Sequence, residues 1–89
     1  MAESIVDIVK IDNILKVENC STRLRLTVKN NKDGIEDKDL KALGIYGIKR
    51  LGDQGLQLII GTDVEHVANE VQTLFLINEK NTNMNKKET

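Results

Sequence analysis

The residues best suited to chemistry lie in one short stretch, Asn19 to Val28, which contains the only cysteine of the chain. Two arginines, Arg23 and Arg25, follow Cys20 at three and five residues. A cysteine is nucleophilic only as its thiolate, and nearby fixed positive charge lowers the pKa of a thiol. Arginine also presents paired donors that match the oxygens of a phosphoryl group. The stretch therefore predicts a reactive thiol beside a clamp for an oxyanion.

The arginines belong to a segment, residues 23–29, in which apolar and polar residues alternate as in a strand with one buried face. If the apolar residues face the core, both arginines leave the same solvent-exposed face, about 7 Å apart along the strand. Residues 14–18 are predicted to form the preceding strand. Residues 18–22, which include Cys20, are then the connection between two antiparallel strands.

The sequence predicts its elements in the order helix, two strands, helix, two strands, helix. Ser4 and Asp7 resemble a capping box, so the first helix is expected to begin at Ser4. Asp37 is interpreted as the N-cap of the second helix and Gly44 as its end. The predicted segments are 4–11, 37–44 and 62–77 for the helices, and 14–18, 23–29, 47–51 and 56–60 for the strands.

Short connections favour antiparallel pairing of neighbouring strands. The sequence thus predicts an α+β fold, a two-layer sandwich in which three helices cover one face of a four-stranded antiparallel sheet. The other face is expected to meet water and to carry Arg23, Arg25 and Gln57. Residues 1–77 are predicted to form this single domain, and residues 78–89 a polar, disordered C-terminal tail.

The composition of the 89-residue chain argues against several classes of function. A net charge of −1, with one tyrosine and one phenylalanine, offers nucleic acid neither electrostatic attraction nor a stacking surface. No apolar run approaches the roughly 18 residues of a membrane span, so we expect no membrane insertion. A single cysteine forms no internal disulfide and supplies no structural zinc site alone. We expect a cytoplasmic, monomeric domain without metal or cofactor.

The segment Val17–Val28 resembles the phosphorylation-site signature of the IIB domain of glucose-family sugar phosphotransferase permeases. Two further segments, Leu40–Gly44 and Gly55–Gly61, are similar to the pattern expected in the second half of that domain. The resemblance covers roughly residues 5–77. There are two departures: Lys10–Asn13 stands where the family usually has a glycine pair, and Ser21 where a small or apolar residue is common.

The resemblance implies a phosphoryl relay. A phosphohistidine on a partner IIA domain would phosphorylate Cys20, and the phosphocysteine would pass the group to a sugar held by the membrane-embedded IIC domain. The chain would then act, at the cytoplasmic face of the membrane, as the phosphohistidine–sugar phosphotransferase component of sugar uptake. The resemblance also marks Gln57 as a neighbour of the site and a supporting phosphate-binding residue, and it implies the same two-layer α+β sandwich.

Each residue of the stretch has an expected role in such a relay. Cys20 is the nucleophile, and Arg23 and Arg25 support first the thiolate and then the phosphate oxygens. The backbone amides of Ser21 and Thr22 are expected to form an anion-binding nest, to which the Thr22 hydroxyl adds a donor.

Two other functions fit parts of the sequence. In a small regulatory α+β binding domain, Cys20 would be incidental, as lone intracellular cysteines often are. A cysteine phosphatase would also place an arginine after its cysteine, but the spacing from Cys20 to Arg23 is short and no glycine-rich loop opens a helix there. His66 is interpreted as a surface histidine, and Lys49 and Arg50 as a solvated pair, with a docking surface as the alternative.

Overall fold

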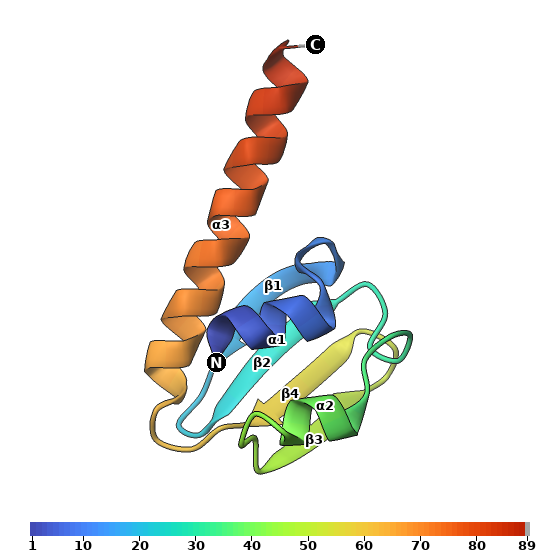
Figure 1. The fold of residues 1–89 in the computed structure, drawn as a ribbon, viewed down its shortest axis with the longest axis vertical. Helices are drawn as coiled ribbons and strands as arrows, with labels where there is room; N and C mark the ends of the chain where they lie inside the picture. Colours follow the sequence, from blue (N-terminus) through green and yellow to red (C-terminus); the bar gives the residue numbers. More distant parts are fainter. Residues whose placement is uncertain (89) are drawn as a thin grey trace.

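The fold is seen in a computed structural model that describes the backbone of residues 1–88 and the side chains of residues 1–80. The predicted order of helices and strands is confirmed, with one additional 3-10 turn, η1, after the first helix (Figure 1). The elements are α1 (Ala2–Val9), η1 (Ile11–Asn13), β1 (Ile14–Asn19), β2 (Arg23–Val28), α2 (Asp37–Lys41), β3 (Gly47–Leu51), β4 (Gly55–Ile59) and α3 (Val64–Glu88).

The four strands form one antiparallel sheet in the order β1-β2-β4-β3. The three helices lie on one face of this sheet, so the predicted α+β two-layer fold is confirmed (Figure 1). In this order β2 and β4 are the central strands, and β1 and β3 form the two edges. The strand that carries both arginines is therefore hydrogen-bonded on both sides.

The core lies between the sheet and the helices. Leu24, Leu26 and Val28 of β2 are buried, as the alternation predicts, and Leu56 and Leu58 of β4 join them. Full burial of one such side chain contributes about 1.5–3 kcal/mol to folding. The helical stripe predicted for α3 also packs into this core: Val64, Val67, Ala68, Val71 and Phe75 are buried, and Leu74 is packed against them.

The start of α1 differs from the prediction. Met1 is the N-cap residue, without a side-chain capping bond, so Ser4 lies inside the helix and the capping-box interpretation is wrong. Ala2, Ile5 and Val9, at helical spacing, are the buried residues of α1. Burial of this stripe sets the position of the helix, because it outweighs the roughly 1 kcal/mol of a cap. Likewise the N-cap of α2 is Glu36, and not Asp37.

Lys10, which ends α1, has an unusual backbone conformation. Its φ of 79° and ψ of 125° fall in a region that favours glycine. This lysine opens the segment where the resembled family usually has a glycine pair. The chain thus adopts a glycine-like backbone conformation after the first helix at a residue that has a Cβ atom.

Arg50 is not a solvated side chain, so that interpretation is wrong for this member of the pair. It lies on the inner side of β3 and is half-buried. Its guanidinium donates to the carbonyl oxygens of Asn31 and Ile35, at 2.7 and 2.9 Å, and to a carboxylate oxygen of Asp37 at 2.6 Å. Arg50 therefore fixes the connection between β2 and α2, while Lys49 is exposed as expected.

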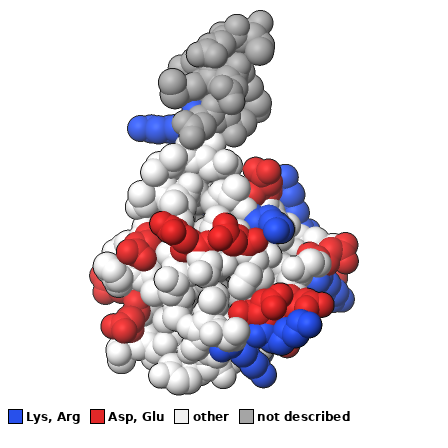
Figure 2. Space-filling view, viewed as in Figure 1, with Lys and Arg blue, Asp and Glu red and all other residues white. Residues whose placement is uncertain are grey.

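Helix α3 continues to Glu88, past the end predicted at about Ile77. The side chains beyond residue 80 lie outside the described part of the chain, so the disordered tail at 78–89 stays a prediction. Within the described residues, no helix is both long and apolar enough to cross a membrane. Figure 2 shows the helix-covered face, on which basic side chains lie beside acidic ones among the described residues.

Candidate active site

Cys20 lies in the tight loop between β1 and β2, with its thiol free and exposed. The amide of Cys20 donates to the carbonyl oxygen of Arg23 at 3.0 Å. This hydrogen bond closes a tight turn, in which Ser21 and Thr22 are the two central residues. Both are exposed. The structure thus places the predicted nucleophile at the exposed tip of a hairpin.

The environment of Cys20 lowers the pKa of its thiol below the ordinary value. The largest cause is the backbone N–H of Arg23, which donates to the sulfur. The N–H of Thr22 and the charges of Arg25 and Arg23 act in the same direction, and partial loss of hydration opposes them. Hydrogen bonds and positive charge favour the thiolate over the thiol. The loop therefore raises the fraction of thiolate, which is the reactive form of a cysteine.

The sequence does not predict one part of this arrangement, the backbone N–H of Arg23 that lowers the pKa of Cys20. The anion-binding nest expected from the amides of Ser21 and Thr22 stays a prediction. No side-chain pattern reports where a backbone amide points. The turn geometry that decides it follows from the hairpin register, in which Asn19 pairs with Leu24.

The loop is held to the rest of the sheet at Thr22. Its carbonyl oxygen accepts hydrogen bonds from the amides of Ile60 and Gly61, both at 2.9 Å. Gly61 has a φ of +104°, a conformation that residues with a side chain rarely adopt. A Cβ atom there would lie 3.5 Å from the ring of Tyr46, which packs beside this glycine. The end of β4 thus acts as a support for the hairpin tip.

Both arginines project from the outer face of the sheet, as the alternation predicts. Arg25 is exposed and Arg23 is half-buried, while the leucine between them points into the core. On the neighbouring central strand, Gln57 is directly opposite Arg25, and Lys49 of β3 is opposite Gln57. These side chains therefore form one row across the outer face.

Gln57 differs from expectation in its burial. It faces outward, yet only 9% of it is exposed, so it does not stand free in water. Gln57 lies on a central strand, between Arg25 on one side and Lys49 on the other. Its side-chain oxygen accepts a hydrogen bond of 3.0 Å from Nη1 of Arg23. The structure thus joins Gln57 to the site through Arg23.

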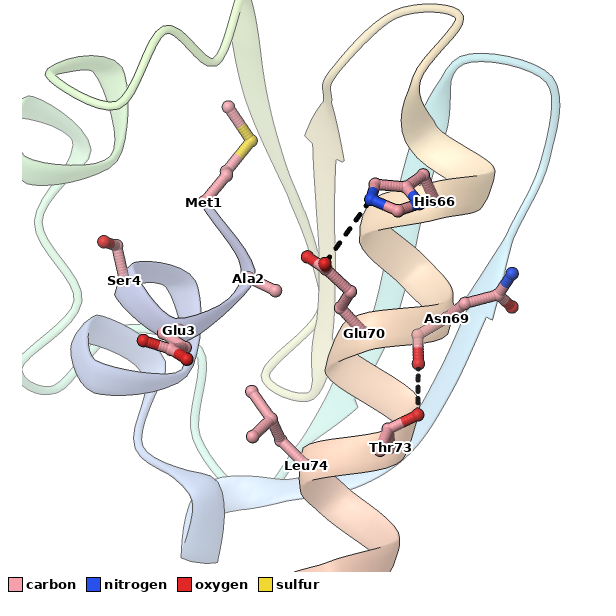
Figure 3. Close-up of a pocket in the computed structure, with 9 residues that line it drawn as sticks. All are labelled: Met1, Ala2, Glu3, Ser4, His66, Asn69, Glu70, Thr73 and Leu74. Atoms are coloured by element: carbon pink, nitrogen blue, oxygen red, sulfur yellow. Dashed lines mark hydrogen bonds and ion pairs between the residues drawn. The ribbon is translucent and has the colours of Figure 1, made fainter.

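An open hollow of about 560 Å³ lies elsewhere, between the start of α1 and the first turns of α3 (Figure 3). Met1, Ala2, Asn69 and Leu74 are among its lining residues. His66 also lines it and pairs with Glu70 at 3.4 Å, with its side chain 79% exposed, in keeping with a surface histidine.

The hollow and the hairpin loop have no lining residue in common. None of the six predicted site residues, Cys20, Ser21, Thr22, Arg23, Arg25 and Gln57, lines the hollow. Among the described residues, no group of three or more His, Cys, Asp or Glu is placed to hold a metal ion. The candidate site is an exposed loop at one end of the sheet, between β1 and β2, and it holds a thiol of lowered pKa with two cationic neighbours, Arg23 and Arg25.

Comparisons with known proteins point to similar domains. Residues 3–33 match the family described as phosphotransferase system, EIIB. The N-acetylglucosamine-specific EIIB component of Streptomyces coelicolor is 39% identical over 65 residues, which cover 73% of this chain and 82% of that protein. The N-acetylglucosamine-specific EIICB component of Bacillus subtilis is 39% identical over 61 residues, which cover 68% of this chain but 13% of that longer protein.

A solved structure also shares the fold. It is the crystal structure of one domain of the IIabc component of the phosphotransferase system from Clostridium difficile. The TM-score is 0.69 at 27% sequence identity, and the superposition covers 81% of this chain and 75% of the other. The similarity therefore extends beyond the cysteine loop to most of the sheet and helices.

Proposed function

This chain belongs to the EIIB family of the phosphotransferase system, the phosphoryl-transfer components of sugar uptake, and we propose that Cys20 is the residue that carries the phosphoryl group. The observation that supports this most directly is the exposed thiol of Cys20, whose pKa is lowered by the amides of Arg23 and Thr22 and by two arginine charges. An exposed thiolate between two reaction partners fits a carrier better than an enzyme with a closed pocket.

The proposed relay has two displacement steps. In the first, the thiolate of Cys20 attacks the phosphorus of a phosphohistidine on a IIA domain. The S–P bond forms as the N–P bond breaks, and the imidazole nitrogen keeps the electron pair. In the second, a sugar hydroxyl on the IIC domain attacks the same phosphorus. The O–P bond forms, the S–P bond breaks, the thiolate returns, and the hydroxyl proton passes to a base or to water.

The neighbours of Cys20 suit both steps because each step moves negative charge. Before transfer, the amides of Thr22 and Arg23 stabilise the thiolate. After transfer, the same donors and the guanidinium groups of Arg23 and Arg25 can bind the phosphoryl oxygens. Ser21 and the Thr22 hydroxyl, which are exposed at the tip, are proposed as supporting phosphate ligands.

The partners follow from the same relay. Relatives such as the Bacillus subtilis protein are named EIICB components, which supports association of this domain with a IIC domain. We propose a IIA phosphohistidine as donor and a IIC-bound sugar as acceptor, with the isolated domain monomeric at the cytoplasmic face of the membrane. The accessible hairpin tip supports this, since it can meet two large domains in turn.

The decisive experiment is phosphorylation in a reconstituted system. The protein is incubated with phosphoenolpyruvate, the general phosphotransferase components and a IIA domain from an N-acetylglucosamine system. Mass spectrometry at neutral pH then locates the label, with Cys20→Ser as control. We expect label on Cys20 alone. Absence of label with several IIA domains would instead favour a regulatory binding domain, and phosphate release without a sugar acceptor would favour a phosphatase.

A further inference from the structure

We propose that Gln57 is a positioning residue for phosphoryl transfer, which holds the Arg23 guanidinium in its working orientation rather than binding phosphate itself. The inference rests on the proposed role of Cys20. It is carried by one contact, the 3.0 Å hydrogen bond from Nη1 of Arg23 to the side-chain oxygen of Gln57. The two residues lie 34 positions apart in sequence and on neighbouring central strands.

The burial of Gln57 makes it a rigid support. With 9% of the residue exposed, its side chain is far less free than that of an exposed residue such as Arg25. It extends from a strand hydrogen-bonded on both sides, between Arg25 on β2 and Lys49 on β3. A long arginine side chain loses about 2 kcal/mol of rotamer entropy when it is fixed. A partner that fixes Arg23 in advance removes part of that cost from the transfer step.

The chemistry of a glutamine side chain suits this position. Its neutral oxygen accepts one N–H of Arg23 and leaves the positive charge of the guanidinium uncompensated. The remaining N–H donors of Arg23 stay available for an oxyanion. A carboxylate at position 57 would also orient the guanidinium, but it would compete with the phosphoryl group for the same charge. An apolar residue would leave Arg23 unanchored.

A double-mutant cycle separates positioning from direct phosphate binding. The four proteins are the unsubstituted chain, Gln57→Leu, Arg23→Lys and the double variant. Rapid-quench kinetics give the rate of phosphoryl transfer from phosphorylated IIA to Cys20 in each. We expect Gln57→Leu to slow transfer about tenfold, the scale of one lost hydrogen bond to a charged group. In the Arg23→Lys background the same substitution should have no further effect, because lysine cannot keep that geometry.

Gln57→Glu provides a second readout that a purely structural role would not move. The new carboxylate should raise the pKa of the Cys20 thiol, measured from the pH dependence of its alkylation, while the folded state is kept. Lys49→Ala is the matched control, because Lys49 is the other cross-strand neighbour of Gln57 and is exposed. It should leave transfer unchanged. The Glu variant also serves as the test if Gln57→Leu does not fold.

The outcomes are distinct. Losses that multiply in the double variant would overturn the inference and indicate that Gln57 acts independently of Arg23, as a direct phosphate ligand. Unchanged transfer and an unchanged alkylation profile in the position-57 variants would also overturn it. If the unsubstituted chain accepts no phosphoryl group, the proposed function fails first, and the inference fails with it.

Discussion

The carbonyl oxygen of Thr22 and the amide of Gly61 are joined by a 2.9 Å hydrogen bond, which ties the hairpin tip to the end of β4. This contact depends on the φ of +104° at Gly61. Alanine at this position would be strained, so we expect Gly61→Ala to lower the free energy of unfolding by about 1–2 kcal/mol. Transfer to Cys20 should slow as well, because the tip loses its support.

Gly34→Ala is the control for this prediction. Gly34 also has a positive φ, of +76°, and it lies in the connection before α2, away from the loop. Urea denaturation should show a comparable loss of stability, whereas the transfer rate should stay at the level of the unsubstituted chain. Equal slowing in both variants would mean that general destabilisation, and not the anchor, limits transfer.

The two arginines should matter more for transfer than for folding. Arg23→Lys and Arg25→Lys keep the charge but lose the forked donors, so we expect about ten- to a hundredfold slower transfer. The urea midpoint should change little for Arg25, which is exposed, and modestly for Arg23, which is half-buried. Transfer kinetics equal to those of the unsubstituted chain in both variants would refute the assignment.

The reactivity of Cys20 should persist at lower pH than that of an ordinary cysteine. The Arg23 amide, chiefly, then the Thr22 amide and the charges of Arg25 and Arg23 lower the pKa of the thiol. Since the thiolate is the reactive form, the rate should fall as the pH drops through that lowered pKa. Removing one charge with Arg25→Gln should move the midpoint to higher pH. Iodoacetamide alkylation across a pH series measures this, with Cys20→Ser as blank, and an identical midpoint in both proteins would contradict it.

Lys10 offers a stabilising substitution. The φ of 79° at Lys10 is strained for a residue with a side chain, and this strain costs about 1–3 kcal/mol. Glycine would relieve the strain, but part of the gain in stability is lost because glycine gives the unfolded chain more conformational freedom. We expect Lys10→Gly to raise the free energy of unfolding by about 1 kcal/mol. Lys29→Gly is the matched control, since Lys29 is an exposed lysine without positive φ, and it should be neutral or destabilising. A loss of stability in Lys10→Gly would show that the strain is absent.

The sequence predicts most of the sheet because alternation follows directly from burial of one face. Leu24 and Leu26 are buried and Arg25 is exposed for that reason. The sequence predicts less well the contacts of a side chain that packs between several secondary-structure elements. Arg50 follows the same alternation, but its role becomes clear only when the connection before α2 folds over it. Ser4 has the residue pattern of an N-cap, but packing of the buried face of α1 places the start of the helix two residues earlier, at Ala2.

In the candidate site, too, some features follow from the local sequence and others depend on tertiary contacts. Cys20 and both arginines are predicted as site residues from their types, their spacing and the family resemblance. The contact between Arg23 and Gln57 depends on the pairing of β2 with β4, which are separated by α2 and β3. Nothing local to either residue predicts that pairing. The Arg23 amide that contacts the sulfur is likewise decided by backbone geometry, which side-chain patterns do not encode.

The position of β2 inside the sheet has a kinetic consequence. A loop that begins and ends in paired strands, and is tied to β4 as well, needs no ordering step when another domain arrives. Binding to such a preformed surface is governed by diffusion and orientation, and dissociation need not wait for a structural change. A carrier of the proposed kind, which must leave one domain before it meets the next, would gain turnover from both properties.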